Sequence, residues 1–199
     1  MDIVIRRAEP GEYEILGEIT AQAYLRDGLL DFGEDDAYLG VLRDVAGRAA
    51  HADVLVAAAD SAVRGRPARD GAAPGRGERD GAVPEGAAGA AAVLGGVTFV
   101  PAGGPMADIA SPGEAEIRML AVSRAARGRG VGEALVRACV HRARAVPGCV
   151  RVVLSTQPTM RTAHRLYERL GFTRTPGRDW NPLPQQLPDM VLLTYELPL

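Results

Sequence analysis

The residues best suited to chemistry form one basic, glycine-rich stretch, Arg127-Gly128-Arg129-Gly130-Val131-Gly132. It follows a strand-like segment at 114–122 and leads into a helical pattern at 130–145. Glycines let backbone N–H groups approach an anion closely, and the N-terminus of a helix adds partial positive charge. The two arginines can add charge-assisted hydrogen bonds to a phosphate. The stretch therefore predicts a cradle for phosphate groups.

The sequence excludes two better-known phosphate loops. All 23 cationic residues are Arg, whereas a Walker-type loop needs a Lys, as does an enzyme that forms a Schiff base. A dinucleotide-binding fingerprint needs Gly where this chain has Glu133, and it usually lies in the first βαβ unit of a chain. A pyrophosphate cradle of another type remains.

Two motifs resemble those of the GNAT N-acetyltransferases. The segment 116–122 followed by 127–135 resembles their acetyl-CoA motif, whose signature Arg/Gln-x-x-Gly-x-Gly/Ala is met by Arg127, Gly130 and Gly132. The segment 161–172 resembles their Ala-x-x-Leu-Tyr-x-x-x-Gly-Phe helix. Together the motifs cover residues 114–173 in the expected order. One departure is Met160, which stands where many relatives carry an Asn that helps to hold the pantetheine arm.

The resemblance implies a GNAT fold, a mixed and mostly antiparallel α/β sheet flanked by helices, in which a parallel strand pair splays apart. It implies acetyl-CoA as co-substrate and no metal. The pantetheine arm would pair with backbone groups of the first strand of that pair, and the diphosphate would lie in the cradle. The implied cofactor-binding residues are Leu120, Ala121, Val122, Arg127, Gly128, Arg129, Gly130, Val131 and Gly132.

The implied reaction is attack of an amine on a thioester. Neutralising a primary ammonium of pKa about 10.4 at pH 7 costs about 4 to 5 kcal/mol, so a base is needed. Glu116 is the candidate base, acting through water, and strand alternation predicts that it shares a face with Leu120 and Val122. Glu114 could substitute for it. Tyr167 is the candidate acid that protonates the leaving thiolate, although the apolar helical stripe around it also allows a simple packing role.

The acceptor should lie against residues 25–40 and 174–190. The acids Asp31, Glu34, Asp35 and Asp36 would suit a cationic amine, and Trp180 could cover an apolar one. Small-molecule and peptide amines both stay open, as do acyl-chain length and homodimer formation. A non-catalytic acyl-CoA-binding sensor or regulatory module is the main alternative to an enzyme, and a domain with an empty cradle is a third.

The elements that must position these residues alternate between strand and helix over 114–170, whereas the flanking segments look antiparallel. Strands are predicted at 3–8, 53–59, 93–100, 114–122, 150–156, 172–174 and 191–197. One helix is predicted to begin after residue 9, and three others are predicted at 36–50, 130–145 and 159–170. The segment 61–92 is rich in Ala, Gly, Pro and Arg, and it carries too little apolar surface to offset its ordering entropy. We therefore expect one domain over residues 1–199 with a disordered insertion at 61–92.

Composition narrows the function further. A net charge of −2 argues against a general nucleic-acid binder, which needs a basic surplus. Cys139 and Cys149 have no CxxC spacing and no His cluster beside them, so neither a metal site nor a redox motif is predicted. No signal peptide and no run of about 18 apolar residues is evident, and we expect a cytoplasmic protein without membrane contact.

Overall fold

A computed structural model describes residues 2–59 and 92–199. Its main elements, in chain order, are β1 (Ile3–Arg7), α1 (Tyr13–Arg26), α2 (Tyr38–Arg43), α3 (Val45–Ala49), β2 (Asp53–Ala59), β3 (Val93–Val100), β4 (Glu114–Val122), α4 (Val131–Arg144), β5 (Arg151–Thr156), α5 (Arg161–Arg169), β6 (Thr173–Arg174) and β7 (Leu193–Pro198). Short 3-10 turns are η1 (Pro10–Glu12), η2 (Gly33–Asp35), η4 (Arg124–Ala126) and η5 (Pro176–Arg178). The insertion predicted at 61–92 lies, apart from its last residue, outside the described residues, and the single-domain organisation stays a prediction.

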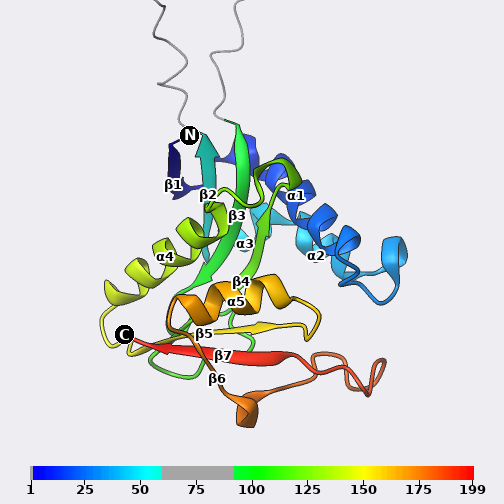
Figure 1. Ribbon diagram of the computed structural model, residues 1–199, viewed down its shortest axis with the longest axis vertical. Helices are drawn as coiled ribbons and strands as arrows, with labels where there is room; N and C mark the ends of the chain where they lie inside the picture. The colour runs from blue at the N-terminus through cyan, green and yellow to red at the C-terminus, as the bar shows by residue number, and fades with distance from the viewer. Residues whose placement is uncertain (1, 60–91) are drawn as a thin grey trace, which may run out of the picture.

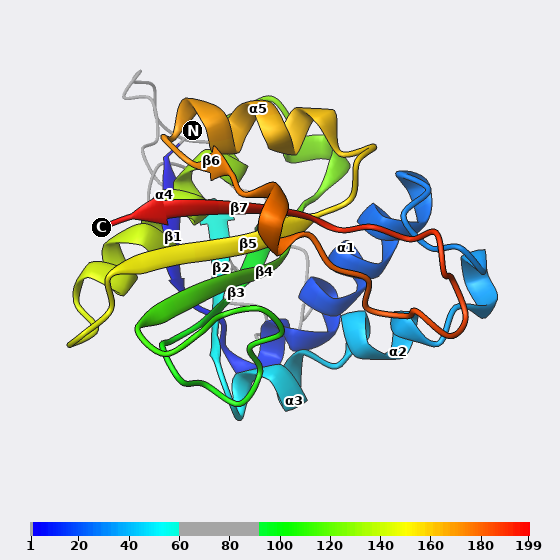
Figure 2. The same cartoon turned by 90° about the horizontal axis from the view of Figure 1, so that it is seen from below.

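The strands form one seven-stranded sheet in the order β1-β2-β3-β4-β5-β7-β6. The described strands pair antiparallel except for β4 and β5, which are parallel. Helices α1, α2 and α3 cover one face of the sheet, and α4 and α5 cover the other (Figure 2). The predicted mixed, mostly antiparallel α/β fold with one parallel pair is confirmed.

Apolar side chains of the strands fill both interfaces. The larger core cluster packs β2–β5 against α4 and α5, with Leu135, Leu154 and Phe99 among its fully buried members. Two smaller clusters, around Leu42 and Leu16, pack α1, α2 and α3 against the opposite face. Burial on both faces stabilises the central strands and keeps the ends of β4 and β5 in fixed positions.

One prediction about the first helices needs correction. The predicted helix 36–50 is divided into α2 and α3 at Asp44, whose carboxylate accepts the N–H of Gly47 at 2.7 Å and so caps α3. An aspartate at this position competes with the continuing helix by bonding the backbone locally. In α1, Ile15 is 55% exposed, and the buried positions are Leu16, Gly17, Thr20 and Ala21.

Candidate active site

Strands β4 and β5 separate part-way along their length. Parallel pairing joins residues 114–117 to 151–154. Beyond that point β4 continues beside β3 to Val122, and β5 continues beside β7 to Thr156. In Figure 1, β4 runs up the page whereas β5 runs across it. The predicted splay is confirmed, and it leaves an opening between the C-terminal ends of the two strands.

A β-bulge lies in β4 at this opening. Two steps along β3, from residue 96 to 98, correspond to three steps along β4, from 121 to 118. Within this stretch Met119 has a φ of 52°, the one positive φ of a non-glycine residue in the described part of the chain. Such a conformation costs about 1–3 kcal/mol and persists only where the surrounding structure fixes it. Bulges of this kind change the direction in which the following side chains point.

The bulge overturns one prediction made from strand alternation. Ile117, Leu120 and Val122 all belong to the core cluster of α4 and α5, whereas Met119 packs with α1 and α2. Glu116, the neighbour of Ile117, points to the opposite face because alternation is regular up to that point. The prediction that Glu116 shares a face with Leu120 and Val122 is therefore wrong.

The start of α4 presents unpaired backbone amides. The first backbone bond of the helix runs from the N–H of Ala134 to the carbonyl of Gly130, so the amides of residues 131–133 have no carbonyl partner within it. Gly128 and Gly130 have φ values of 75° and 81°, in the left-handed region that glycine favours. A Cβ at either position would meet nothing within 4 Å. This open loop with its free amides fits a phosphate group.

Gly132 lies in the first turn of α4, between the cradle and the opening of the sheet. A Cβ there would lie 3.5 Å from Leu166 of α5 and 3.7 Å from Val122 of β4. Leu120, Ala121 and Val122 lie on the stretch of β4 that has no partner on β5. The residues present therefore fit a slender chain that runs from the cradle into the sheet.

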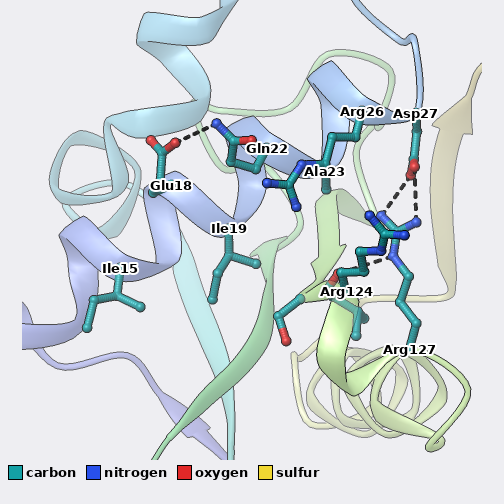
Figure 3. A pocket seen from close by; sticks show the side chains of 11 residues that line it. Ile15, Glu18, Ile19, Gln22, Ala23, Arg26, Asp27, Arg124 and Arg127 are labelled. Carbon is teal, nitrogen blue, oxygen red and sulfur yellow. Dashed lines mark hydrogen bonds and ion pairs between the residues drawn. The ribbon is translucent and has the colours of Figure 1, made fainter.

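The Arg127 side chain turns away from the amides and toward α1 (Figure 3). Its two Nη atoms lie 3.0 and 2.9 Å from the two carboxylate oxygens of Asp27, and both side chains are 43% exposed. The pair borders a cleft of about 690 Å³ between α1 and the segment after β4, with Ile15, Ile19 and Val122 among the apolar residues that line it. An anion in the cradle would have to compete with Asp27 for this guanidinium.

A second cavity, of about 570 Å³, lies at the opening of the sheet. Its walls come from β4, from the ends of β5 and α1, from the segment between α1 and α2, and from the loop before β7. A hydrogen bond of 2.8 Å from Gln157 Nε2 to the Leu29 carbonyl ties two of these walls together. Met160 also lines the cavity, and it accepts a hydrogen bond at its sulfur from Thr156 Oγ1 at 3.2 Å.

Tyr167 of α5 contributes to this cavity from inside the core. It is 4% exposed, and its ring packs 5.9 Å from that of Phe172 and 6.0 Å from that of Tyr195, measured between centroids. Its hydroxyl makes no hydrogen bond to any described residue. Burial raises the pKa of Tyr167 above the ordinary 10.0, so the phenol stays protonated at neutral pH.

Glu116 lies behind the cavity rather than in its wall. Its carboxylate is 1% exposed, and Oε2 accepts the N–H groups of Asp108, Ile109 and Ala110 at 2.9, 3.0 and 3.1 Å. Oε1 lies 3.9 Å from Nε of Arg118. Burial raises the pKa of Glu116, and the N–H bonds and the Arg118 charge counteract only part of this effect.

The alternative base Glu114 is occupied by two arginines. Its carboxylate binds Arg151 at 2.9 Å and Arg178 at 2.7 Å. Burial alone would raise the pKa of Glu114, but the bonds from Arg178, Ser111 and Arg151 outweigh burial and hold the pKa below its ordinary value. Glu114 is thus a structural link between β4, β5 and η5.

The acids predicted for the acceptor side divide into two groups. Asp31 and Asp36 line the cavity together with Trp180, whereas Glu34 and Asp35 do not. Asp36 also organises its own turn, because its oxygens accept the N–H groups of Tyr38 at 2.9 Å and Phe32 at 3.4 Å.

Sequence reasoning missed Asp108 and Tyr24, which also line the cavity. Asp108 lies in a segment that is marked only by its glycines and prolines, and no spacing relates it to Arg118. Tyr24 ends the helical pattern of α1 and is part of the same apolar stripe as its core residues.

Over the described ranges, no His, Cys, Asp and Glu residues gather in a group of three that could hold a metal ion. In the same part of the chain, no helix is long and apolar enough to cross a membrane.

Comparison with known proteins identifies this arrangement. Residues 77–172 match the model of the acetyltransferase (GNAT) family. These residues carry a GNAT acetyltransferase domain. No curated protein matches the sequence of the chain. Its fold is similar to that of the PaiA N-acetyltransferase from Thermoplasma acidophilum, solved in complex with coenzyme A, at a TM-score of 0.65 and 12% identity over 100% of both chains.

Two further structures support the same fold for this chain. A GNAT-family acetyltransferase from Staphylococcus aureus Mu50 is similar at a TM-score of 0.63, with 12% identity over 99% of both chains. The ribosomal-protein-alanine N-acetyltransferase from Brucella melitensis is similar at a TM-score of 0.60, with 18% identity over 98% of this chain and 99% of the other. The family predicted from the two sequence motifs is confirmed, and with it acetyl transfer as the general activity.

Proposed function

We propose that this protein moves the acetyl group of acetyl-CoA to a primary amine by direct attack, with Glu116 as water-mediated base and Tyr167 as acid. The observation that carries the proposal is the hydroxyl of Tyr167, which has no partner among the described residues and lies in the cavity at the sheet opening. A group that must give a proton to a leaving sulfur needs this freedom.

Acetyl-CoA would be held by main-chain groups on both sides of the opening. The amides at the start of α4 are free to bind its diphosphate, and the stretch at Leu120, Ala121 and Val122, which has no partner on β5, can bind its pantetheine arm. Arg127 and Arg129 supply positive charge beside the cradle. When bound, the cofactor supplies the thioester that the amine attacks.

Glu116 removes the amine proton through water, because its carboxylate is buried behind the cavity wall. The raised pKa makes it a stronger base than an exposed glutamate, and its remaining oxygen, Oε1, faces the Arg118 side of the cavity wall. Tyr167 donates its phenolic proton to the departing thiolate, whose parent pKa is about 8.5. Base and acid thus lie on opposite faces of the splayed sheet.

A thiol-release assay tests this function directly. The protein should release free coenzyme A from acetyl-CoA when given an amine from a panel of alkylamines, polyamines, amino acids and peptides, and mass spectrometry should find the acetylated amine. Propionyl- and succinyl-CoA in parallel would define acyl length. Saturable binding of acetyl-CoA in calorimetry without release by any amine would instead favour the acyl-CoA-binding sensor.

A further inference from the structure

The cavity contains a carboxylate for which the proposed chemistry has no use. Asp108 lies on the segment before β4, lines the cavity and is 35% exposed. Its Oδ2 pairs with Nη2 of Arg118, which is 14% exposed. Its Oδ1 accepts no hydrogen bond from any described residue, and it is therefore available to a ligand.

Several hydrogen bonds hold the backbone around Asp108 in place. Three consecutive N–H groups, of residues 108–110, donate to the buried Oε2 of Glu116. Arg118 donates to the carbonyl of Met106 at 2.5 Å, and Arg178 donates to that of Ile109 at 2.8 Å. A carboxylate held on so rigid a support has a defined position in the cavity, as recognition of a ligand requires.

The net charge of the groups around Asp108 also favours binding of a cation. Glu116 and Asp108 carry two negative charges when ionised, and Arg118 between them carries one positive charge. An ammonium group at the free oxygen of Asp108 would neutralise this set. Of the two other carboxylates of the cavity, Asp36 is already bonded to its own turn, and Asp31 is exposed to solvent.

The mouth of the cavity is apolar. Phe32, Val41 and Leu183 line it and are 53%, 45% and 39% exposed, which makes them three of the few large apolar side chains left open to solvent in the described part of the chain. Trp180 lines the same cavity. Exposed apolar side chains that gather at a cavity indicate a ligand with an apolar body.

We propose that Asp108 binds the ammonium group of the acceptor, a primary alkylamine with an apolar or aromatic body, and that Glu116 and Arg118 position Asp108 for this contact. The inference rests on the proposed function in one respect, because it takes the ligand of this cavity to be the acceptor. It gives Glu116 a second role, as the support of the segment that carries Asp108.

Trp180 provides the test, because it is the one tryptophan of the chain and it lines the cavity. Its fluorescence is followed while 2-phenylethylamine is added without acetyl-CoA, and 3-phenylpropan-1-ol serves as an uncharged probe of similar shape. The wild type should respond saturably to the amine and at least tenfold more weakly to the alcohol. Asp108→Asn should weaken amine binding at least tenfold and leave the alcohol unchanged.

Asp189→Asn is the matched control, because Asp189 is an exposed acid of the loop beside the cavity but does not line it. It should bind the amine within twofold of the wild type. Asp108→Ser provides a second variant, and coenzyme A binding in calorimetry verifies that each variant is folded. Equal amine affinity in wild type and both Asp108 variants, or no saturable response in the wild type, would overturn the proposal.

The outcome is separable from that of the proposed function. Amine binding that depends on Asp108 without thiol release would keep this inference and reject the acetyl transfer. Thiol release with an unchanged amine KM in Asp108→Asn would keep the transfer and reject the role of Asp108.

Discussion

Replacing Tyr167 by Phe removes one oxygen atom and leaves the packing intact. The ring contacts with Phe172 and Tyr195 do not involve the hydroxyl, which makes no hydrogen bond to a described residue. Removing a buried hydroxyl without a protein partner changes the free energy of unfolding by about 1 kcal/mol or less. A large effect on turnover would therefore report chemistry and not a loss of structure.

The size of the expected effect follows from the role of an acid. General acid catalysis contributes about 100- to 10,000-fold to rate, or about 3 to 5.5 kcal/mol at 1.36 kcal/mol per tenfold step. We expect Tyr167→Phe to lower kcat by a factor in this range. The KM for acetyl-CoA should change by about twofold or less, because the amides at the start of α4 lie away from the phenol.

The assay is thiol release at saturating acetyl-CoA, with Tyr195→Phe as matched control. Tyr195 belongs to the same aromatic group, but its hydroxyl bonds Glu168 at 3.3 Å and it does not line the cavity. Because burial raises the pKa of Tyr167, the acid should remain protonated up to about pH 10 and set no alkaline limb below that value. Turnover of Tyr167→Phe within threefold of the wild type would refute the assignment.

Three further predictions concern charged groups around the site. Asp27→Asn should tighten coenzyme A binding, measured by low-salt calorimetry, by up to about fivefold. The reason is that an exposed ion pair contributes about 0.2–1 kcal/mol, and its loss frees Arg127. Weaker binding would contradict competition between Asp27 and the cofactor for Arg127. Glu114→Gln should lower the free energy of unfolding in urea by about 1–3 kcal/mol at pH 7. Because the folded pKa of Glu114 lies below 4.5, the stabilisation by its ion pairs is present above pH 4.5 and is lost as the pH falls. The variant and the wild type should therefore have the same free energy of unfolding in acid. A difference that stays constant with pH would argue against ion pairing. Glu116→Gln keeps an oxygen for the three N–H groups and should fold, but its kcat should fall about 100-fold. In the wild type, the acid limb of kcat/KM should lie above pH 4.5, because the pKa of Glu116 is raised. An unchanged pH profile in the variant would exclude Glu116 as the base.

Local patterns predicted well the strand and the helix that flank the glycine loop. The glycine loop and the helix after it depend on residues within one turn of each other, and the predicted helix 130–145 is observed as Val131–Arg144. The same holds for the strand 114–122, which is observed with identical bounds. Periodicity and glycine placement carry this information without reference to distant parts of the chain.

The surroundings of the cradle and of the cavity depend on contacts between distant residues, and there the sequence was a poorer guide. Asp27 and Arg127 are 100 positions apart, so no local pattern connects them. The wall of the cavity combines residues of α1, β4, β5 and the last loop, and Asp108 acquires its position only through Glu116 and Arg118. Such sites are set by tertiary packing and not by spacing along the chain.

The bulge in β4 had one visible signal, which lies on the neighbouring strand. Gly95 and Gly96 interrupt β3, and a Cβ at Gly95 would lie 2.4 Å from the carbonyl oxygen of Ala121. Paired glycines inside a strand indicate a bulge or a close backbone approach. Simple alternation fails for Glu116 because the bulge lies in β4, whereas its signal lies on β3.

The bulge also divides the side chains of β4 between the two faces of the sheet. Before Met119, the side chains of Glu116 and Arg118 lie on the face opposite α4 and α5 and hold the Asp108 segment. After it, Leu120 and Val122 face α4 and α5, beside the cradle. Without the extra residue, alternation would place all four side chains on one face. The strain of about 1–3 kcal/mol at Met119 is thus the structural cost of moving the side chains of β4 from the face of α1 and α2 to the face of α4 and α5, at the point where β5 departs.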